Sequence, residues 1–130
     1  MNTLVLILLI AALLPLAAKL PVVVAMHRAG GYNNKLPRVQ QQQLDQFGQR
    51  ATAAHYNSFE ALSYFAPAIL AALATGGAVE SVVSYAWAFI VCRVLYVTFY
   101  LLDQDKLRSL VWLAGLLASI MIYIEVYRAL

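Results

Sequence analysis

Four long apolar stretches constrain this chain more than any other feature. They cover roughly residues 2–26, 47–75, 78–102 and 107–127, and a helix needs about 20 mostly apolar residues to cross a bilayer. Hydrophobic residues make up 63% of the chain and charged residues 12%, whereas soluble domains contain about 45–50% and about 25%. The pattern predicts one all-α, integral membrane domain over residues 1–130, folded as a four-helix bundle, and it excludes a soluble enzyme.

The polar residues exclude several further kinds of chemistry. The single cysteine, Cys92, rules out an intramolecular disulfide, a Cys-cluster zinc site and a CxxC redox motif. His27 and His55 lack metal-ligand spacing with each other or with a cysteine, so we expect no metal. Basic cytoplasmic loops of a membrane protein explain the net charge of +3. We therefore expect membrane lipids, and no nucleic acid, as partners.

Lysine and arginine are distributed unevenly among the expected loops. Those in the first loop, the approach to the second span and the third loop are Arg28, Lys35, Arg38, Arg50, Lys106 and Arg108. The second loop, around Gly76 and Gly77, has none, and neither does the N-terminal tip. By the positive-inside rule, the first and third loops face the cytoplasm and both termini face the opposite side.

Polar side chains form a stripe along the second expected span. Arg50, Asn57 and Tyr64 recur every seven residues, and Glu60 lies three residues after Asn57. Residues at these spacings share one face of a helix. A charged residue at the centre of a membrane helix costs about 2.5–3.5 kcal/mol on insertion scales. Glu60 is therefore expected to face polar groups inside the protein.

The third expected span has a polar face of its own. Arg93, Tyr96 and Tyr100 occur at i, i+3 and i+7, which again places them on one side of a helix. Two interpretations stay open. In one, Glu60 and Arg93 form a buried ion pair that fixes helix packing. In the other, arginines converge on a pocket open to the cytoplasmic leaflet and bind a carboxylate through paired hydrogen bonds.

The residues of the second and third spans also carry a family resemblance. Residues 49–67, QRATAAHYNSFEALSYFAP, contain an Asn-x-x-Glu motif at 57–60 after an arginine. Residues 93–100, RVLYVTFY, are followed by Arg108 after a short turn. With four spans in 130 residues, the chain resembles bacterial-type members of the MAPEG family, the membrane-associated proteins in eicosanoid and glutathione metabolism.

This resemblance implies an assembly and a site. The bundle would form a homotrimer in a bacterial inner membrane, with glutathione as co-substrate between subunits near the cytoplasmic side. The positions that the resemblance assigns to glutathione binding are Arg28, Arg50, Asn57, Glu60, Arg93, Tyr96 and Tyr100. Arg108 matches the arginine that stabilises the glutathione thiolate, and it is the candidate catalytic residue.

The implied function is that of a microsomal-type glutathione transferase. Such a protein conjugates hydrophobic small-molecule electrophiles to glutathione, or reduces them, in detoxification. The alternative is a non-catalytic membrane subunit or scaffold with the same fold. Three departures from the family pattern bear on this choice, because relatives carry arginine, tyrosine and proline where this chain has Ala53, Ala61 and Ser63. The sequence favours an enzyme without deciding the question.

Overall fold

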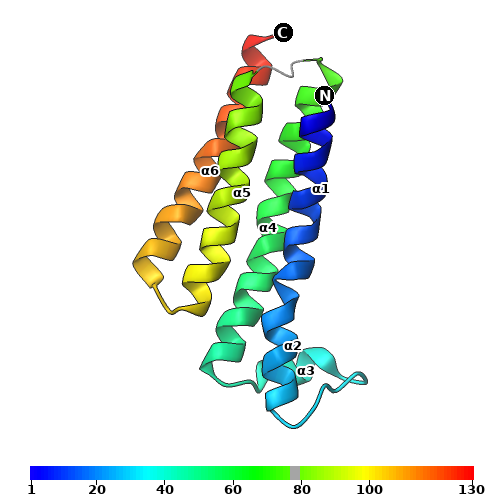
Figure 1. Ribbon diagram of the computed structural model, residues 1–130, viewed down its shortest axis with the longest axis vertical. Coiled ribbons are helices and arrows are strands. Elements are labelled where there is room, and N and C mark those ends of the chain that lie inside the picture. The colour runs from blue at the N-terminus through cyan, green and yellow to red at the C-terminus, as the bar shows by residue number, and fades with distance from the viewer. Residues whose placement is uncertain (77–79) are drawn as a thin grey trace.

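The computed structural model describes residues 1–76 and 80–130, and every regular element among them is a helix (Figure 1). The elements are α1 (Asn2–Ala17), α2 (Lys19–Arg28), α3 (Pro37–Gln42), α4 (Gln46–Ala74), α5 (Glu80–Leu101) and α6 (Asp105–Arg128). The expected all-α class is confirmed. The expected start of the third span at residue 78, and Gly77 before it, lie outside the described residues.

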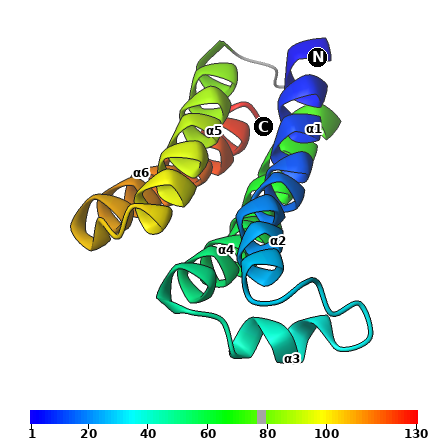
Figure 2. The same cartoon turned by 60° about the horizontal axis from the view of Figure 1, so that its bottom comes forward.

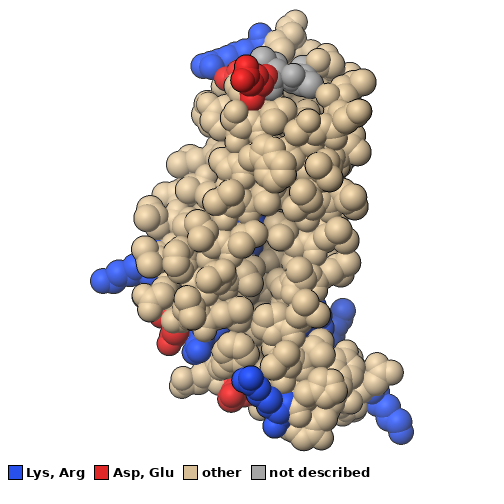
Figure 3. All heavy atoms as spheres, in the orientation of Figure 1, with Lys and Arg blue, Asp and Glu red and all other residues tan. Residues whose placement is uncertain are grey.

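Three helical segments are long and apolar enough to cross a membrane: Asn2–Arg28, Glu80–Leu101 and Asp105–Arg128. The fourth long helix, α4, is not among them, and its first half contains Arg50, His55, Asn57 and Glu60. Figure 3 shows the middle of one face almost free of charged side chains, which lie towards both ends, with most of the visible lysine and arginine towards the lower end. A membrane crossing by α4 stays a prediction.

The long helices lie side by side, while α3 does not follow their direction. In Figure 1, both termini, the end of α4 and the start of α5 lie at one end, and α3 and the α5–α6 turn lie towards the other. In Figure 2, α3 runs across the lower ends of α2 and α4. The polar segment after α2, expected to be a loop, thus contains a short helix. The first and third loops approach the same end of the molecule.

The first apolar segment is broken at Ala18, between α1 and α2. Pro15 and Pro21 predict a kink here because proline cannot donate a backbone hydrogen bond. The break places Pro21 in the first turn of α2, where backbone N–H groups have no acceptor within the helix. The side chain of His55 packs against the break: its Nδ1 donates to the carbonyl of Pro15 at 2.8 Å.

Replacing His55 with alanine is expected to lower the free energy of unfolding by about 1–3 kcal/mol, because a buried carbonyl loses its donor. His55 is only 9% exposed. Denaturation in detergent, followed by circular dichroism, measures the change. The matched control is His27→Ala, because His27 is exposed and its loss should change stability by less than about 0.5 kcal/mol. Equal effects of the two substitutions would contradict this role for His55.

The hydrophobic core lies where α1, α4, α5 and α6 meet, and it holds α4 against α5. Phe65 of α4 stacks on Phe89 of α5 with ring centroids 3.8 Å apart and planes 4° from parallel. Small buried residues on α4, such as Ala61 and Ala68, let neighbouring helices approach closely. This packing fixes the relative positions of the polar faces of α4 and α5.

Candidate functional site

The start of α4 positions the first arginine of the site. Asp45 caps the helix, with its Oδ1 accepting a hydrogen bond from the backbone N–H of Gly48 at 2.8 Å. A side chain at Gly48 would clash, because its Cβ would lie 2.5 Å from the Cβ of Leu44. The tight cap places Arg50 near the end of α5, in the second turn of α4.

A hydrogen-bonded chain links α4 to α5 through Asn57. Arg93 donates from Nη2 to Oδ1 of Asn57 at 3.0 Å, and Nδ2 of Asn57 donates to Oε2 of Glu60 at 2.8 Å. Arg93 is 4% exposed, whereas Glu60 is exposed. The proposed direct ion pair between Glu60 and Arg93 is not among the ion pairs of the described residues. Asn57 connects the two charged groups instead.

Cations and aromatic rings alternate from α5 to the first turns of α6. The guanidinium carbon of Arg93 lies 4.2 Å from the ring centroid of Tyr96, and that of Arg108 lies 4.3 Å from the ring centroid of Tyr100. The two tyrosine rings meet edge to face at 5.5 Å. Because a cation is attracted to the face of an aromatic ring, these contacts orient both guanidinium groups.

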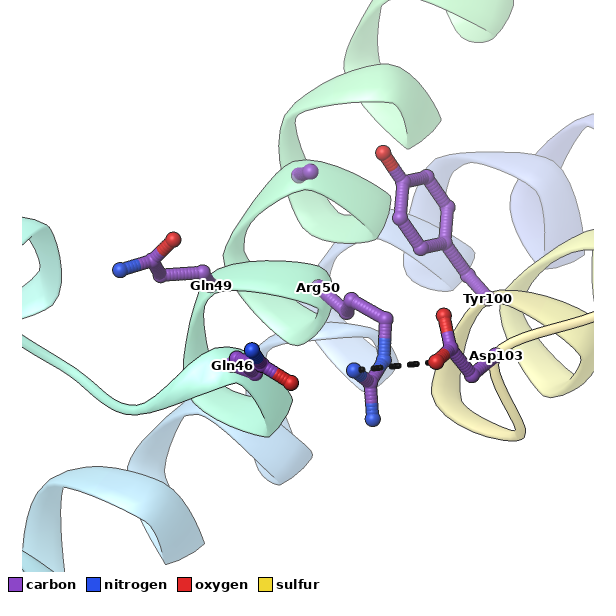
Figure 4. A pocket seen from close by; sticks show the side chains of 6 residues that line it. Gln46, Gln49, Arg50, Tyr100 and Asp103 are labelled. Carbon is purple, nitrogen blue, oxygen red and sulfur yellow. Dashed lines mark ion pairs between the residues drawn. The ribbon is translucent and has the colours of Figure 1, made fainter. Parts of the chain in front are cut away.

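A pocket of about 430 Å³ opens between the start of α4 and the end of α5 (Figure 4). Its lining residues are Gln46, Gln49, Arg50, Ala53, Tyr100 and Asp103. In Figure 4, Arg50 extends from α4 towards Asp103, which follows α5. Nη1 of Arg50 lies 3.6 Å from Oδ2 of Asp103. The pocket thus combines a cation, amide groups and a phenol ring.

A second pocket, of about 220 Å³, also borders Tyr100. It is lined by Tyr96, Tyr100, Arg108, Ser109 and Trp112. Tyr100 lines both pockets, and Trp112 is partly exposed on α6. Arg108 and an exposed indole therefore share one pocket, where a polar group and an apolar group could bind next to each other.

Three buried polar atoms have no hydrogen-bond partner among residues 1–76 and 80–130. They are Nε of Arg50, Nη1 of Arg93 and the hydroxyl of Tyr64. A buried donor without an acceptor costs about 1–3 kcal/mol, so such groups are rare in folded proteins. Two of the three belong to arginines of the polar faces. Their unused donors suit an acceptor supplied from outside this chain.

The structure brings most of the expected site residues together, but not all. The residues that line the two pockets or belong to the contacts just described are Arg50, Asn57, Glu60, Arg93, Tyr96, Tyr100 and Arg108. Arg28 lies apart: it lines a pocket of about 190 Å³ with Asp45, Leu44 and Phe47. No group of three His, Cys, Asp or Glu residues that could hold a metal ion occurs in the described part of the chain.

Sequence reasoning missed Asp103 and Trp112. Asp103 lies in the short turn between α5 and α6, and Trp112 lies on the apolar helix α6, and neither is among the site residues expected from the sequence. A signal for Asp103 existed, since an acidic turn residue near several arginines at one end is a natural ion-pair partner. Trp112 lies four residues after Arg108, so the two share a face of α6, but this spacing alone does not indicate that they line one pocket.

The sequence model of the MAPEG family matches residues 3–127 of the chain. This is nearly its whole length, so the chain belongs to the MAPEG family. A search of curated proteins found no match, and a search of solved structures found none. Together with three apolar helices of spanning length, membership makes this an integral membrane protein of a family associated with glutathione metabolism.

Proposed function

We propose that this protein is a glutathione-dependent transferase or peroxidase that acts on hydrophobic electrophiles in the membrane. The observation that carries the proposal is the continuous array of Arg93, Tyr96, Tyr100 and Arg108, beside two pockets that share Tyr100 as a lining residue. Family membership supports a role related to glutathione. A protein that only packed helices would have little need for cations and phenols arranged around pockets.

Glutathione matches the donors of this site. It has two carboxylates, and Arg50 and Arg93 each have a buried guanidinium N–H without a partner in the described residues. Arginine binds carboxylates through two parallel hydrogen bonds. Asn57 and Tyr96 would add neutral polar groups beside Arg93. The peptide would then lie along the polar faces of α4 and α5, with its thiol near Tyr100.

Arg108 is the proposed catalytic residue. A free thiol has a pKa of about 8.5 and reacts as its thiolate, so the site must favour the anion at neutral pH. The cation of Arg108 and a hydroxyl donated by Tyr100 would stabilise the sulfur anion. The thiolate would attack the electrophilic carbon and form a C–S bond while the leaving group departs. The exposed Trp112 provides an apolar surface for such a substrate.

The proposed assembly is a homotrimer of four-helix bundles, with α4 as the fourth span and both termini away from the cytoplasm. Glu60 supports association, because an exposed carboxylate halfway along α4 would be costly in contact with lipid. A neighbouring subunit could cover it, and glutathione bound at that interface would contact two chains. The positive charges near α3 and the α5–α6 turn support the orientation, and the proposed location is a bacterial inner membrane.

The second candidate is a scaffold or non-catalytic membrane subunit. Ala53 favours it, because this residue lines the pocket between α4 and the end of α5 at a position where relatives carry arginine. Under this alternative, Arg93 and Asn57 would serve only to join α4 to α5. The array that ends at Arg108 favours the enzyme, since Arg108 contacts neither Arg93 nor Asn57 directly in the contacts described above.

A conjugation assay on the detergent-purified protein tests the proposal. Glutathione and an aryl halide are mixed with the protein, and the thioether is followed by its absorbance. A hydroperoxide replaces the aryl halide in a parallel assay. We expect either product to form faster than in detergent alone, with saturation in glutathione. No rate above background with any electrophile would favour the scaffold.

A further inference from the structure

The ion pair between Arg50 and Asp103 is long and exposed, so a ligand could break it at little cost in free energy. Nη1 of Arg50 lies 3.6 Å from Oδ2 of Asp103, the two side chains form no hydrogen bond among the described residues, and the side chain of Asp103 is 71% exposed. Bidentate arginine–carboxylate pairs are the strong ones, and single exposed pairs contribute little. Nε of Arg50 is buried and has no partner among the described residues. The N–H group at Nε of Arg50 is thus available to a further acceptor.

Asp103 closes the C-terminal end of α5 in a left-handed backbone conformation. Asp103 has a φ of 60°, in the left-handed region that favours glycine. Its N–H donates to the carbonyl of Tyr100 at 3.2 Å, and the N–H of Gln104 donates to that of Phe99 at 2.9 Å. This pair of bonds is the Schellman motif, whose left-handed position is usually glycine. Here a carboxylate occupies it and points into the pocket (Figure 4).

We propose that Asp103 is an internal competitor of the ligand: its carboxylate occupies Arg50 and must be displaced by a ligand carboxylate. This inference rests on the proposed binding of glutathione and adds a specificity-determining residue to that site. A ligand carboxylate could pair with Nε and one Nη of Arg50 together, which Asp103 does not do. Displacement would therefore favour ligands with a well-placed carboxylate over anions that form one contact.

The competitor also makes binding depend on the turn between α5 and α6. When the ion pair between Asp103 and Arg50 breaks, the turn no longer has this contact with α4. Tyr100 precedes the turn and Arg108 follows it. A ligand carboxylate bound to Arg50 would thus affect, through this turn, the region around the glutathione thiol. Asp103 is a specificity residue in this account, because it acts on the ligand through Arg50.

The test is a calorimetric titration of the detergent-purified, full-length protein with glutathione at low salt. Asp103→Asn removes the charge, and asparagine also tolerates the left-handed conformation. Asp103→Gly removes the side chain and keeps the turn. Both variants should bind glutathione about two- to five-fold more tightly than the wild type, the range expected for one exposed ion pair. Added salt should reduce this difference in glutathione affinity between the variants and the wild type.

The matched control is Asp105→Asn, which changes the net charge equally, two residues away in the first turn of α6. It should leave the affinity unchanged, because Asp105 forms no ion pair within the described residues. A second probe is glutathione amidated at both carboxylates, for which the Asp103 variants should gain nothing.

Two results would overturn the inference, and they are distinguishable. Weaker or unchanged glutathione binding by Asp103→Asn and Asp103→Gly, with normal wild-type binding, would mean that the Arg50–Asp103 pair supports the site instead of competing for it. The proposed function would then stand. No binding by the wild type or any variant would overturn both the proposed function and the inference that rests on it.

Discussion

Replacing Arg108 with alanine is expected to lower the turnover of glutathione conjugation by about 10²–10³-fold, because the developing sulfur anion loses its nearest cation. The fold should be retained, since the side chain of Arg108 lies over the ring of Tyr100 and forms no hydrogen bond or ion pair among the described residues. Steady-state kinetics with an aryl halide measure the turnover, and circular dichroism in the same detergent measures the fold.

Lys106 supplies the matched control for this prediction. It lies two residues before Arg108 in the first turn of α6, carries the same charge and is exposed. Lys106→Ala should leave turnover within about two-fold, because exposed charges far from the reacting atom are screened by solvent. An Arg108→Ala variant as active as Lys106→Ala would exclude Arg108 from catalysis.

Replacing Arg93 with alanine is expected to be the most destabilising change at the site. It removes the hydrogen bond from a 4% exposed guanidinium to Asn57, and the contact with the ring of Tyr96. Because the amide oxygen of Asn57 loses its donor in a half-buried place, the free energy of unfolding should fall by about 2–4 kcal/mol. Glutathione binding should be lost as well.

Arg128→Ala is the corresponding control at the other end of the molecule. Arg128 pairs with Glu125 at 3.2 Å, but its side chain is 68% exposed, so its loss should change stability by less than about 1 kcal/mol. Chemical denaturation of both variants in one detergent gives the comparison. If Arg93→Ala were no less stable than Arg128→Ala, Arg93 would not be holding α4 against α5.

The parts of the fold that depend on periodicity could be predicted from the sequence. The lengths of the apolar stretches predicted the three helical segments that are long and apolar enough to span a membrane, and the prolines predicted the break near Ala18. The seven-residue spacing placed Arg50 and Asn57 on one face, and the i, i+3, i+7 spacing did the same for Arg93 and Tyr96. Periodicity reports which residues share a face, so it found both polar stripes.

Contacts between elements could not be predicted in the same way. Residue spacing suggested that Glu60 pairs directly with Arg93. Instead, the amide of Asn57 connects them, because it accepts a hydrogen bond from Arg93 and donates one to Glu60. The family resemblance grouped Arg28 with the other arginines by its position, whereas the course of α2 places it in a pocket with Asp45. Asp103 reaches Arg50 only because the turn after α5 adopts a left-handed backbone.

The central claim, that this site binds glutathione as a reactive thiolate, is tested most directly by one titration. Glutathione is added to the detergent-purified protein at neutral pH, and thiolate absorbance is followed in the ultraviolet. We predict a saturable thiolate signal that Arg108→Ala abolishes and Lys106→Ala preserves. A flat titration with the folded wild-type protein would contradict the claim, and the scaffold would become the better account of this MAPEG-family protein.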